Sequence, residues 1–148
     1  MEENVTIERV GKESYAEIVD VWEASVRATH DFLSEEDIQF FKPLILNEYL
    51  AVVDLCCIRD PSSGRIMGFL GTVGQQIEML FIHPDYRNKG MGKAFMEYAI
   101  RQCKANRVEV NEQNEQAVGF YKHLGFKVIK RCEYDNMGKP FPLLQMML

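Results

Sequence analysis

The spacing of apolar residues divides the chain into strand-like and helix-like segments. Apolar and polar residues alternate over VTIERV at 5–10, which predicts a half-buried strand. Apolar residues then recur every three or four positions, which predicts a helix over 14–29. At its start, Ser14 and Glu17 have the spacing of a capping box, in which each side chain bonds the backbone N–H of the other residue.

A second, weaker cap signal at Ser34 and Asp37 precedes another helical pattern, with apolar residues at Ile38, Phe41 and Ile45. Pro43 lies inside this pattern. Because proline has no backbone N–H and its ring clashes with the preceding turn, we expect it to break or kink the helix.

The rest of the chain alternates between hairpins and strand–helix–strand units. The expected elements are strands at 50–60, 65–73 and 77–82, a helix at 91–104, a strand at 107–111, a short helix from 115 that ends at Gly125, and strands at 127–134 and 141–148. Hairpins join antiparallel strands, whereas strand–helix–strand crossovers join parallel ones. The pattern therefore predicts an α/β (α+β) fold, a mixed sheet with helices on its faces, in a single domain spanning 1–148.

Composition narrows the classes of function. The net charge of −5 argues against generic binding to nucleic acid or to an anionic membrane. No apolar run approaches the ~20 residues of a membrane helix, and the acidic start MEENVTIERV has no apolar signal core, so we expect a cytoplasmic protein. The four cysteines form no C-x-x-C pair and the three histidines show no ligand spacing, so we expect reduced, mostly buried thiols and no metal.

The stretch YRNKGMGKAF at 86–95 carries the most specific chemistry. It lies between a strand-like and a helix-like run, and it combines Gly90 and Gly92 with basic residues at 87, 89 and 93. Glycines let backbone N–H groups approach a phosphate closely, and a helix N-terminus adds partial positive charge. A dinucleotide fingerprint would need glycine at Phe95, and a P-loop would need glycine at Arg87 and Ser or Thr at Ala94. What remains is R-x-x-G-x-G.

This turn resembles the [QR]-x-x-G-x-[GA] motif through which the GCN5-related N-acetyltransferases bind acetyl-CoA. A second block of that family, N-x-x-A-x-x-F-Y-x-x-x-G-F, is similar to the stretch with Asn114, Ala117, Phe120, Tyr121, Gly125 and Phe126. The resemblance covers nearly the whole chain, and further stretches resemble a bacterial subgroup of the family, the YjaB-type acetyltransferases.

The resemblance implies a mostly antiparallel, seven-stranded sheet in which two parallel central strands, 77–82 and 108–111, splay apart. The gap would expose the backbone of the first strand to the pantetheine arm, and a backbone N–H near Leu80 could polarise the thioester carbonyl. The residues expected to bind acetyl-CoA are Leu80, Phe81, Ile82, Arg87, Asn88, Lys89, Gly90, Met91, Gly92, Lys93, Asn114, Ala117 and Tyr121. No metal is expected.

Direct acetyl transfer to an amine needs a base for the ammonium and an acid for the leaving thiolate. The family resemblance makes Tyr121 the candidate acid, although a buried core tyrosine would occupy the same position. Glu78 is the candidate base, and a solvated or structurally paired carboxylate is the alternative. The acceptor site would involve His30, Asp31 and Phe32, with a packing role as the alternative for His30. Asn114 could contact pantetheine, cap the following helix, or do both.

The leading hypothesis is an acetyl-CoA-dependent N-acetyltransferase acting on a primary amine, either a small molecule or a protein lysine or N-terminus. The alternative is a non-catalytic acyl-CoA-binding sensor or interaction module. We expect the region 29–49 and the last hairpin near 139–141 to set the acceptor, and either a monomer or a homodimer is compatible with the sequence.

Overall fold

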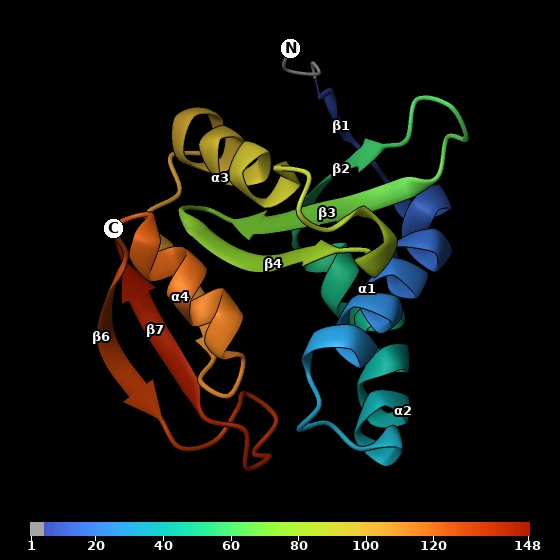
Figure 1. Ribbon diagram of the computed structural model, residues 1–148. Coiled ribbons are helices and arrows are strands. Elements are labelled where there is room, and N and C mark those ends of the chain that lie inside the picture. Colours follow the sequence, from blue (N-terminus) through green and yellow to red (C-terminus); the bar gives the residue numbers. More distant parts are fainter. Residues whose placement is uncertain (1–4) are drawn as a thin grey trace.

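The computed structural model describes residues 5–148, which form a seven-stranded sheet with four α-helices (Figure 1). Along the chain the elements are β1 (Ile7–Arg9), α1 (Tyr15–Thr29), α2 (Glu35–Leu44), β2 (Asp54–Arg59), β3 (Ile66–Val73), β4 (Gln76–Ile82), α3 (Met91–Gln102), β5 (Arg107–Asn111), α4 (Glu115–His123), β6 (Lys127–Cys132) and β7 (Leu143–Met147). The expected order of strands and helices is confirmed.

The strands lie in the order β1-β2-β3-β4-β5-β7-β6. Only β4 and β5 run parallel, and every other neighbouring pair is antiparallel. This is the mixed, mostly antiparallel sheet that the family resemblance implied. Figure 1 shows its two halves, with β1–β4 on one side and β6 and β7 on the other.

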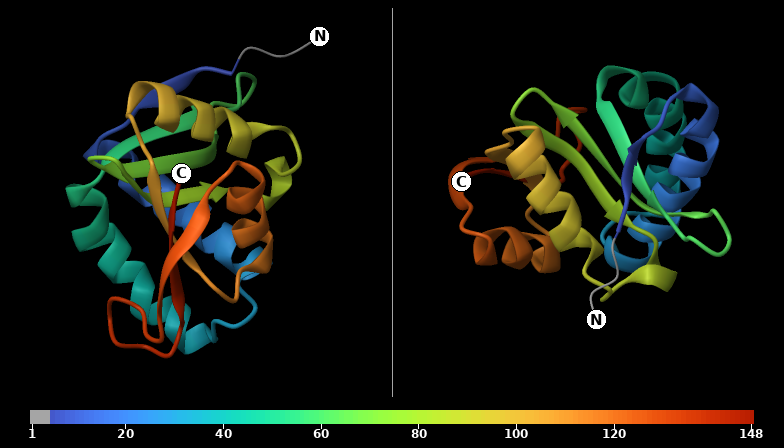
Figure 2. Two further views of the ribbon diagram at one scale, coloured as in Figure 1. Left: turned by 90° about the vertical axis from the view of Figure 1, so that its left-hand side faces the viewer. Right: turned by 90° about the horizontal axis from the view of Figure 1, so that it is seen from above.

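Helices cover both faces of the sheet and create two cores. Apolar residues of α3 and α4 pack on one face, whereas those of α1 and α2 pack on the other, and the view from above in Figure 2 shows the sheet between α3 and the α1–α2 pair. Successive strand residues point to opposite faces. The adjacent Cys56 and Cys57 accordingly enter different cores, and all four cysteines are free thiols, two buried and two partly buried.

The predicted capping box at the start of α1 is wrong. Ser14 ends a short 3-10 turn (Lys12–Ser14), has helical backbone angles and makes no cap hydrogen bond. Glu17 instead reaches across to the sheet, where its Oε2 accepts the backbone N–H of Ile66 at 2.8 Å. The tertiary contact satisfies a buried strand-end donor, and this use of the carboxylate replaces the local cap.

The weaker cap signal at α2 is correct. Ser34 Oγ accepts the N–H of Asp37 at 3.1 Å, and Asp37 Oδ2 accepts the N–H of Ser34 at 3.0 Å. Pro43, which we expected to break or kink the helix, does not break it, because the chain stays helical through Leu44. The regular α-helix gives way there to a π-helix over Ile45–Tyr49. A wider helical turn after the missing proline N–H accommodates the lost bond without ending the helix.

The second expected strand, at 50–60, begins later than predicted. Residues 50–52 form a 3-10 turn, and β2 starts only at Asp54. Leu50 is fully buried in the α1–α2 core. The apolar run LAVV therefore begins with a residue that packs against helices and not with a residue of the sheet. A short apolar run does not distinguish these two uses by its periodicity.

Candidate functional site

The parallel strands β4 and β5 separate soon after they meet. Their backbone pairing is confined to Gln76 with Arg107 and Ile77 with Val108, although β4 continues to Ile82 and β5 to Asn111. Beyond Ile77, β4 pairs with β3 along one edge only. Alternate N–H and C=O groups of β4 therefore point into the gap, as the expected splay requires.

A β-bulge lies at the start of this gap. Gly71 pairs with Met79 and Thr72 pairs with Ile77, so Glu78 is the extra residue of β4. The bulge turns the following side chains over, because Ile77 packs in the α3–α4 core while Met79, two residues later, packs against the α1–α2 core. Sequence alternation alone did not reveal this bulge.

The gap opens into a cavity of about 810 Å³ that passes between the two halves of the sheet. At one end it is lined by the glycine turn and the first turn of α3. Along the middle it is lined by 77–82 of β4, 108–111 of β5 and the inner side of α4. At the other end it is lined by α1, the α2 region and the loop before β7. One continuous space therefore connects the glycine turn to both helical layers.

The glycine turn is shaped by two left-handed residues. Asn88 has φ of 63° and Gly90 has φ of 80°, and Gly90 is the N-cap of α3. The first helical bond is Ala94 N–H to the Gly90 carbonyl. The N–H groups of 91–93 therefore have no intrahelical acceptor and are suited to an anion.

Most of the turn residues expected to bind acetyl-CoA line the cavity: Arg87, Asn88, Gly90, Met91, Gly92 and Lys93. Lys89 does not. Its Nζ lies 5.8 Å from the centre of the Tyr86 ring, outside the cavity wall. Leu80, Phe81 and Ile82 also line the cavity, and so does Met79, which packs against the α1–α2 core as well. An open glycine cradle at the end of a long cavity fits a pyrophosphate with an extended pantetheine arm.

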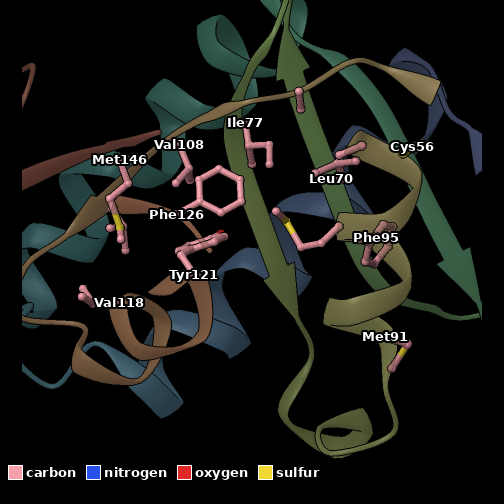
Figure 3. Close-up of a cluster of buried hydrophobic side chains, with 14 of the residues drawn as sticks. Cys56, Leu70, Ile77, Met91, Phe95, Val108, Val118, Tyr121, Phe126 and Met146 are labelled. Atoms are coloured by element: carbon pink, nitrogen blue, oxygen red, sulfur yellow. The ribbon is translucent and has the colours of Figure 1, made fainter. Parts of the chain in front are cut away.

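Tyr121 is positioned by α4 and by two aromatic neighbours. Its ring centre lies 5.4 Å from that of Phe120 and 5.8 Å from that of Phe126, and Figure 3 shows it beside Phe126 with Val108 and Ile77 nearby. The residue is buried but borders the cavity. Burial raises the pKa of its hydroxyl, and Oη has no hydrogen-bond partner within residues 5–148. The phenol is therefore kept protonated with a donor available to the cavity.

Glu78 lines the middle of the same cavity. Although much of the residue is exposed, the surrounding protein desolvates its carboxyl group, and this burial, with a smaller contribution from the charge of Glu109, raises its pKa. Gln76 Nε2 donates to Glu78 Oε1 at 3.2 Å. Both oxygens of Glu109 are occupied, one by Asn136 and the other by Gln145, each at 3.2 Å. Glu78 is thus the carboxylate with an oxygen left to accept a proton.

Asn114 and Ala117 come from the start of α4. Asn114 is the N-cap, and its Oδ1 accepts the N–H of Ala117 at 3.3 Å. The capping alternative is therefore correct, and because both residues also line the cavity, the amide nitrogen of Asn114 is left for a ligand.

At the end of the cavity formed by α1 and the α2 region, His30 is part of the lining. Asp31 and Phe32, the other two residues expected at the acceptor site, are not. Phe32 instead packs with its ring centre 5.2 Å from that of His30 and 5.7 Å from that of Phe141. The last hairpin contributes residues earlier than expected, which are Asp135, Asn136 and Met137.

Several lining residues had no signal in the sequence: Ser25, Thr29, Phe41, Tyr49 and Glu109. The expected range 29–49 included three of them, but helical periodicity alone does not separate a cavity wall from a core. Only the tertiary arrangement of α1, the α2 region and β5 around the gap identifies them.

Two absences concern the described residues only. Between residues 5 and 148, no helix combines the length and the apolar character that crossing a membrane requires. The same part of the chain contains no group of three or more His, Cys, Asp or Glu side chains arranged to hold a metal ion.

Comparison with known proteins identifies the family. A family model described as an acetyltransferase (GNAT) domain matches residues 33–146. The peptidyl-lysine N-acetyltransferase YjaB of Escherichia coli strain K12 is 42% identical over 142 residues, which cover 96% of this chain and 95% of that protein. The solution structure of apo YjaB from Escherichia coli matches with a TM-score of 0.86 and 40% identity, and it covers 98% of this chain and 97% of that one.

A more distant structure shares the fold. The PaiA N-acetyltransferase of Thermoplasma acidophilum, solved in complex with coenzyme A, matches with a TM-score of 0.73 at 21% identity over 99% of this chain and all of that one (100%). The splayed strands, the glycine turn and the matching family model agree on one conclusion. This chain belongs to the GNAT family and is an acetyl-CoA-dependent N-acetyltransferase that acetylates an amine.

Proposed function

We propose that this enzyme acetylates lysine side chains of proteins. The observation that carries the proposal is the single cavity that joins the glycine turn to an end lined by the aromatic residues His30, Phe41 and Tyr49, with Glu78 and Tyr121 also on its wall. An extended aliphatic amine suits such a wall better than a bulky polar acceptor. The relative at 42% identity bears the name peptidyl-lysine N-acetyltransferase, which supports the same class of acceptor.

The acetyl-CoA would lie along the gap. The N–H groups at the start of α3 and the side chains of Arg87 and Lys93 would hold the pyrophosphate, because partial and full positive charges converge there. The free edge of β4 over Leu80–Ile82 would bond the pantetheine arm, and Asn114 would add its amide nitrogen. Acetyl-CoA supplies an acetyl group activated as a thioester.

Glu78 would serve as the base. Its raised pKa brings it closer to the operating pH, which favours a carboxylate that can take a proton from the lysine ammonium. The freed amine then forms the new C–N bond as the C–S bond breaks and the electron pair leaves with sulfur. The nitrogen, which carries a positive charge after the attack, loses its second proton to water in the cavity. An N–H near Leu80 would stabilise the charge on the carbonyl oxygen in the transition state.

Tyr121 would serve as the acid. Its phenol is held protonated by burial, and its Oη has no protein partner within the described chain, so its proton is available for the departing thiolate. The phenolate would then recover a proton from solvent through the cavity. Tyr121 and Glu78 thus line the same cavity, where Tyr121 would donate a proton and Glu78 would accept one.

The test is acetylation of lysine peptides followed by mass spectrometry, together with release of the CoA thiol. Tyr121→Phe should lower kcat by about 10²-fold or more, the usual contribution of a positioned acid, while the Kd for acetyl-CoA stays unchanged. Tyr134→Phe is the matched control, because Tyr134 is exposed and lies outside the cavity. If the wild-type protein binds acetyl-CoA but acetylates no lysine in a broad peptide panel, the proposal is wrong, and the acceptor is a small-molecule amine or a protein N-terminus.

The working compartment that we propose is the cytoplasm. All four cysteines are free, including the adjacent buried pair Cys56 and Cys57, which is typical of a reducing environment. The test is to treat intact cells with a thiol-alkylating reagent and unfold the protein in its presence. All four cysteines should be alkylated if the compartment is reducing.

A further inference from the structure

His30 is held firmly at the amine end of the cavity. Its backbone N–H donates to the Val26 carbonyl at 2.7 Å and closes α1, while its own carbonyl accepts the N–H of Leu33 at 3.0 Å. Its ring centre lies 5.2 Å from that of Phe32 and 6.3 Å from that of Phe81, and the residue is 6% exposed. Backbone bonds and aromatic packing therefore fix the ring before any ligand arrives.

The hydrogen bonds of Thr29 determine which ring nitrogen carries the proton. Thr29 Oγ1 lies 2.9 Å from the carbonyl oxygen of Ser25 and 2.7 Å from His30 Nδ1. A carbonyl oxygen can only accept, so the single hydroxyl proton of Thr29 points to Ser25. Oγ1 must then accept from Nδ1–H. A neutral imidazole has one N–H, which leaves Nε2 with an unshared electron pair.

Nε2 faces the cavity rather than the protein interior. It has no hydrogen-bond partner within residues 5–148, yet it is not sealed off, since the only side-chain polar atom of this part of the chain that is both buried and unpartnered is Asn106 Oδ1. His30 is among the residues that line the cavity, so the small exposed part of its ring opens there. Burial lowers the pKa of the imidazole to about 4, against a weaker opposite effect of Asp31, so the ring is neutral near pH 7.

We propose that His30 Nε2 accepts a hydrogen bond from the acceptor amine and orients it, so that the site selects primary alkylamines. This inference rests on the proposed acetylation of lysine and deepens it. A primary ammonium group has three N–H donors, so it can bond Nε2 and still release a proton to Glu78. A quaternary ammonium of the same charge and stem has no N–H and cannot make this bond. The ring of Phe81, which also lines the cavity, lies alongside for the aliphatic stem.

The first test observes the histidine ring directly and needs no turnover. In protein with ¹⁵N-labelled histidine, His30 should show a protonated Nδ1 and an unprotonated Nε2 at pH 7. With CoA bound, titration with butylamine should shift the Nε2 resonance, whereas butyltrimethylammonium should leave it in place. A ring protonated on Nε2, or an equal response to both cations, would overturn the inference.

The second test uses kinetics with butylamine and a lysine peptide. His30→Gln and His30→Phe should each raise the KM for the amine by about ten- to hundredfold, as expected for a lost hydrogen bond to a charged group, with the KM for acetyl-CoA unchanged. His123→Phe, on the exposed surface of α4, is the matched control. Unchanged amine KM in a folded His30→Phe variant would refute the role of Nε2. If the wild-type enzyme acetylates neither amine, the proposed function fails, while the ring measurement still decides whether Nε2 binds the amine.

Discussion

Ile77 and Val108 are the last residues at which β4 and β5 pair, and Glu78 follows immediately as the extra residue of a bulge. The two features act together. The end of pairing frees one backbone edge of β4, and the bulge places a carboxyl group at the mouth of the gap. The cavity between the glycine turn and the α1–α2 layer therefore passes through the gap that opens where the sheet stops being continuous.

The bulged carboxyl group should control the low-pH side of the rate profile. If Glu78 is the base, kcat/KM falls as pH drops through its raised pKa, and Glu78→Gln removes this dependence along with most activity. Glu109→Gln removes a neighbouring negative charge, so the pKa of Glu78 should fall and the low-pH limb should move to lower pH. The measurement is kcat/KM for a lysine peptide against pH.

The control for this profile is Glu112→Gln, because Glu112 is an exposed partner of Arg131 outside the cavity. Glu112→Gln should leave the low-pH limb of the kcat/KM profile unchanged. A Glu78→Gln enzyme with the wild-type low-pH limb would show that another group is the base.

Gly90 should matter for acetyl-CoA beyond its effect on stability. Gly90 and Gly64 have φ of 80° and 76°, and an added methyl group would meet no atom within 4 Å at either position. Gly90→Ala and Gly64→Ala should therefore each lower the free energy of unfolding by about 1 kcal/mol, through the strain of a left-handed alanine alone. Only Gly90 borders the cavity, so only Gly90→Ala should weaken acetyl-CoA binding, by about tenfold if one hydrogen bond to a phosphate oxygen is lost.

Denaturant unfolding and calorimetric titration of the two glycine variants separate these effects. Equal Kd values for acetyl-CoA would contradict a role of the Gly90 turn in holding the pyrophosphate.

Glu17 should stabilise the fold through its bond to β3. Glu17→Ala leaves the backbone N–H of the buried Ile66 without its carboxylate acceptor, which should cost about 1–3 kcal/mol of unfolding free energy. Glu97→Ala, at an exposed helical position of α3, should change stability by less than about 0.5 kcal/mol. Urea denaturation of both variants makes the comparison, and equal losses would mean that the Glu17–Ile66 bond contributes nothing specific.

Lys139 should hold the loop before β7 against α2. Its Nζ lies 3.4 Å from Asp37 Oδ1 and 4.4 Å from the centre of the Phe40 ring. Lys139→Met should speed amide hydrogen exchange in 135–141 and raise the KM for the amine. Global stability should change by less than about 1 kcal/mol, because the pair is only partly buried and ion pairs at a protein surface contribute little. Lys130→Met on the exposed face of β6 is the control. Exchange rates that match the control would argue against this connection.

The order of elements and the glycine turn were accessible from the sequence because both depend on local patterns. Alternation and helical spacing identify which residues must be buried, and the turn needs glycine at 90 for its left-handed backbone. Capping was predicted less well. The Ser34–Asp37 box is local and was correct. Glu17 instead accepts a hydrogen bond from the backbone N–H of Ile66 on β3, which no local pattern could indicate.

By itself, the sequence determined the seven strands and four helices, the mixed sheet, the family and the glycine turn before α3. Only the tertiary structure decided that Glu78 is a bulge residue and that Lys89, Asp31 and Phe32 lie outside the cavity. The physical reason is the range of the interactions. Periodicity and turn chemistry act between residues close in the chain, whereas strand register and the wall of a cavity depend on packing between distant segments.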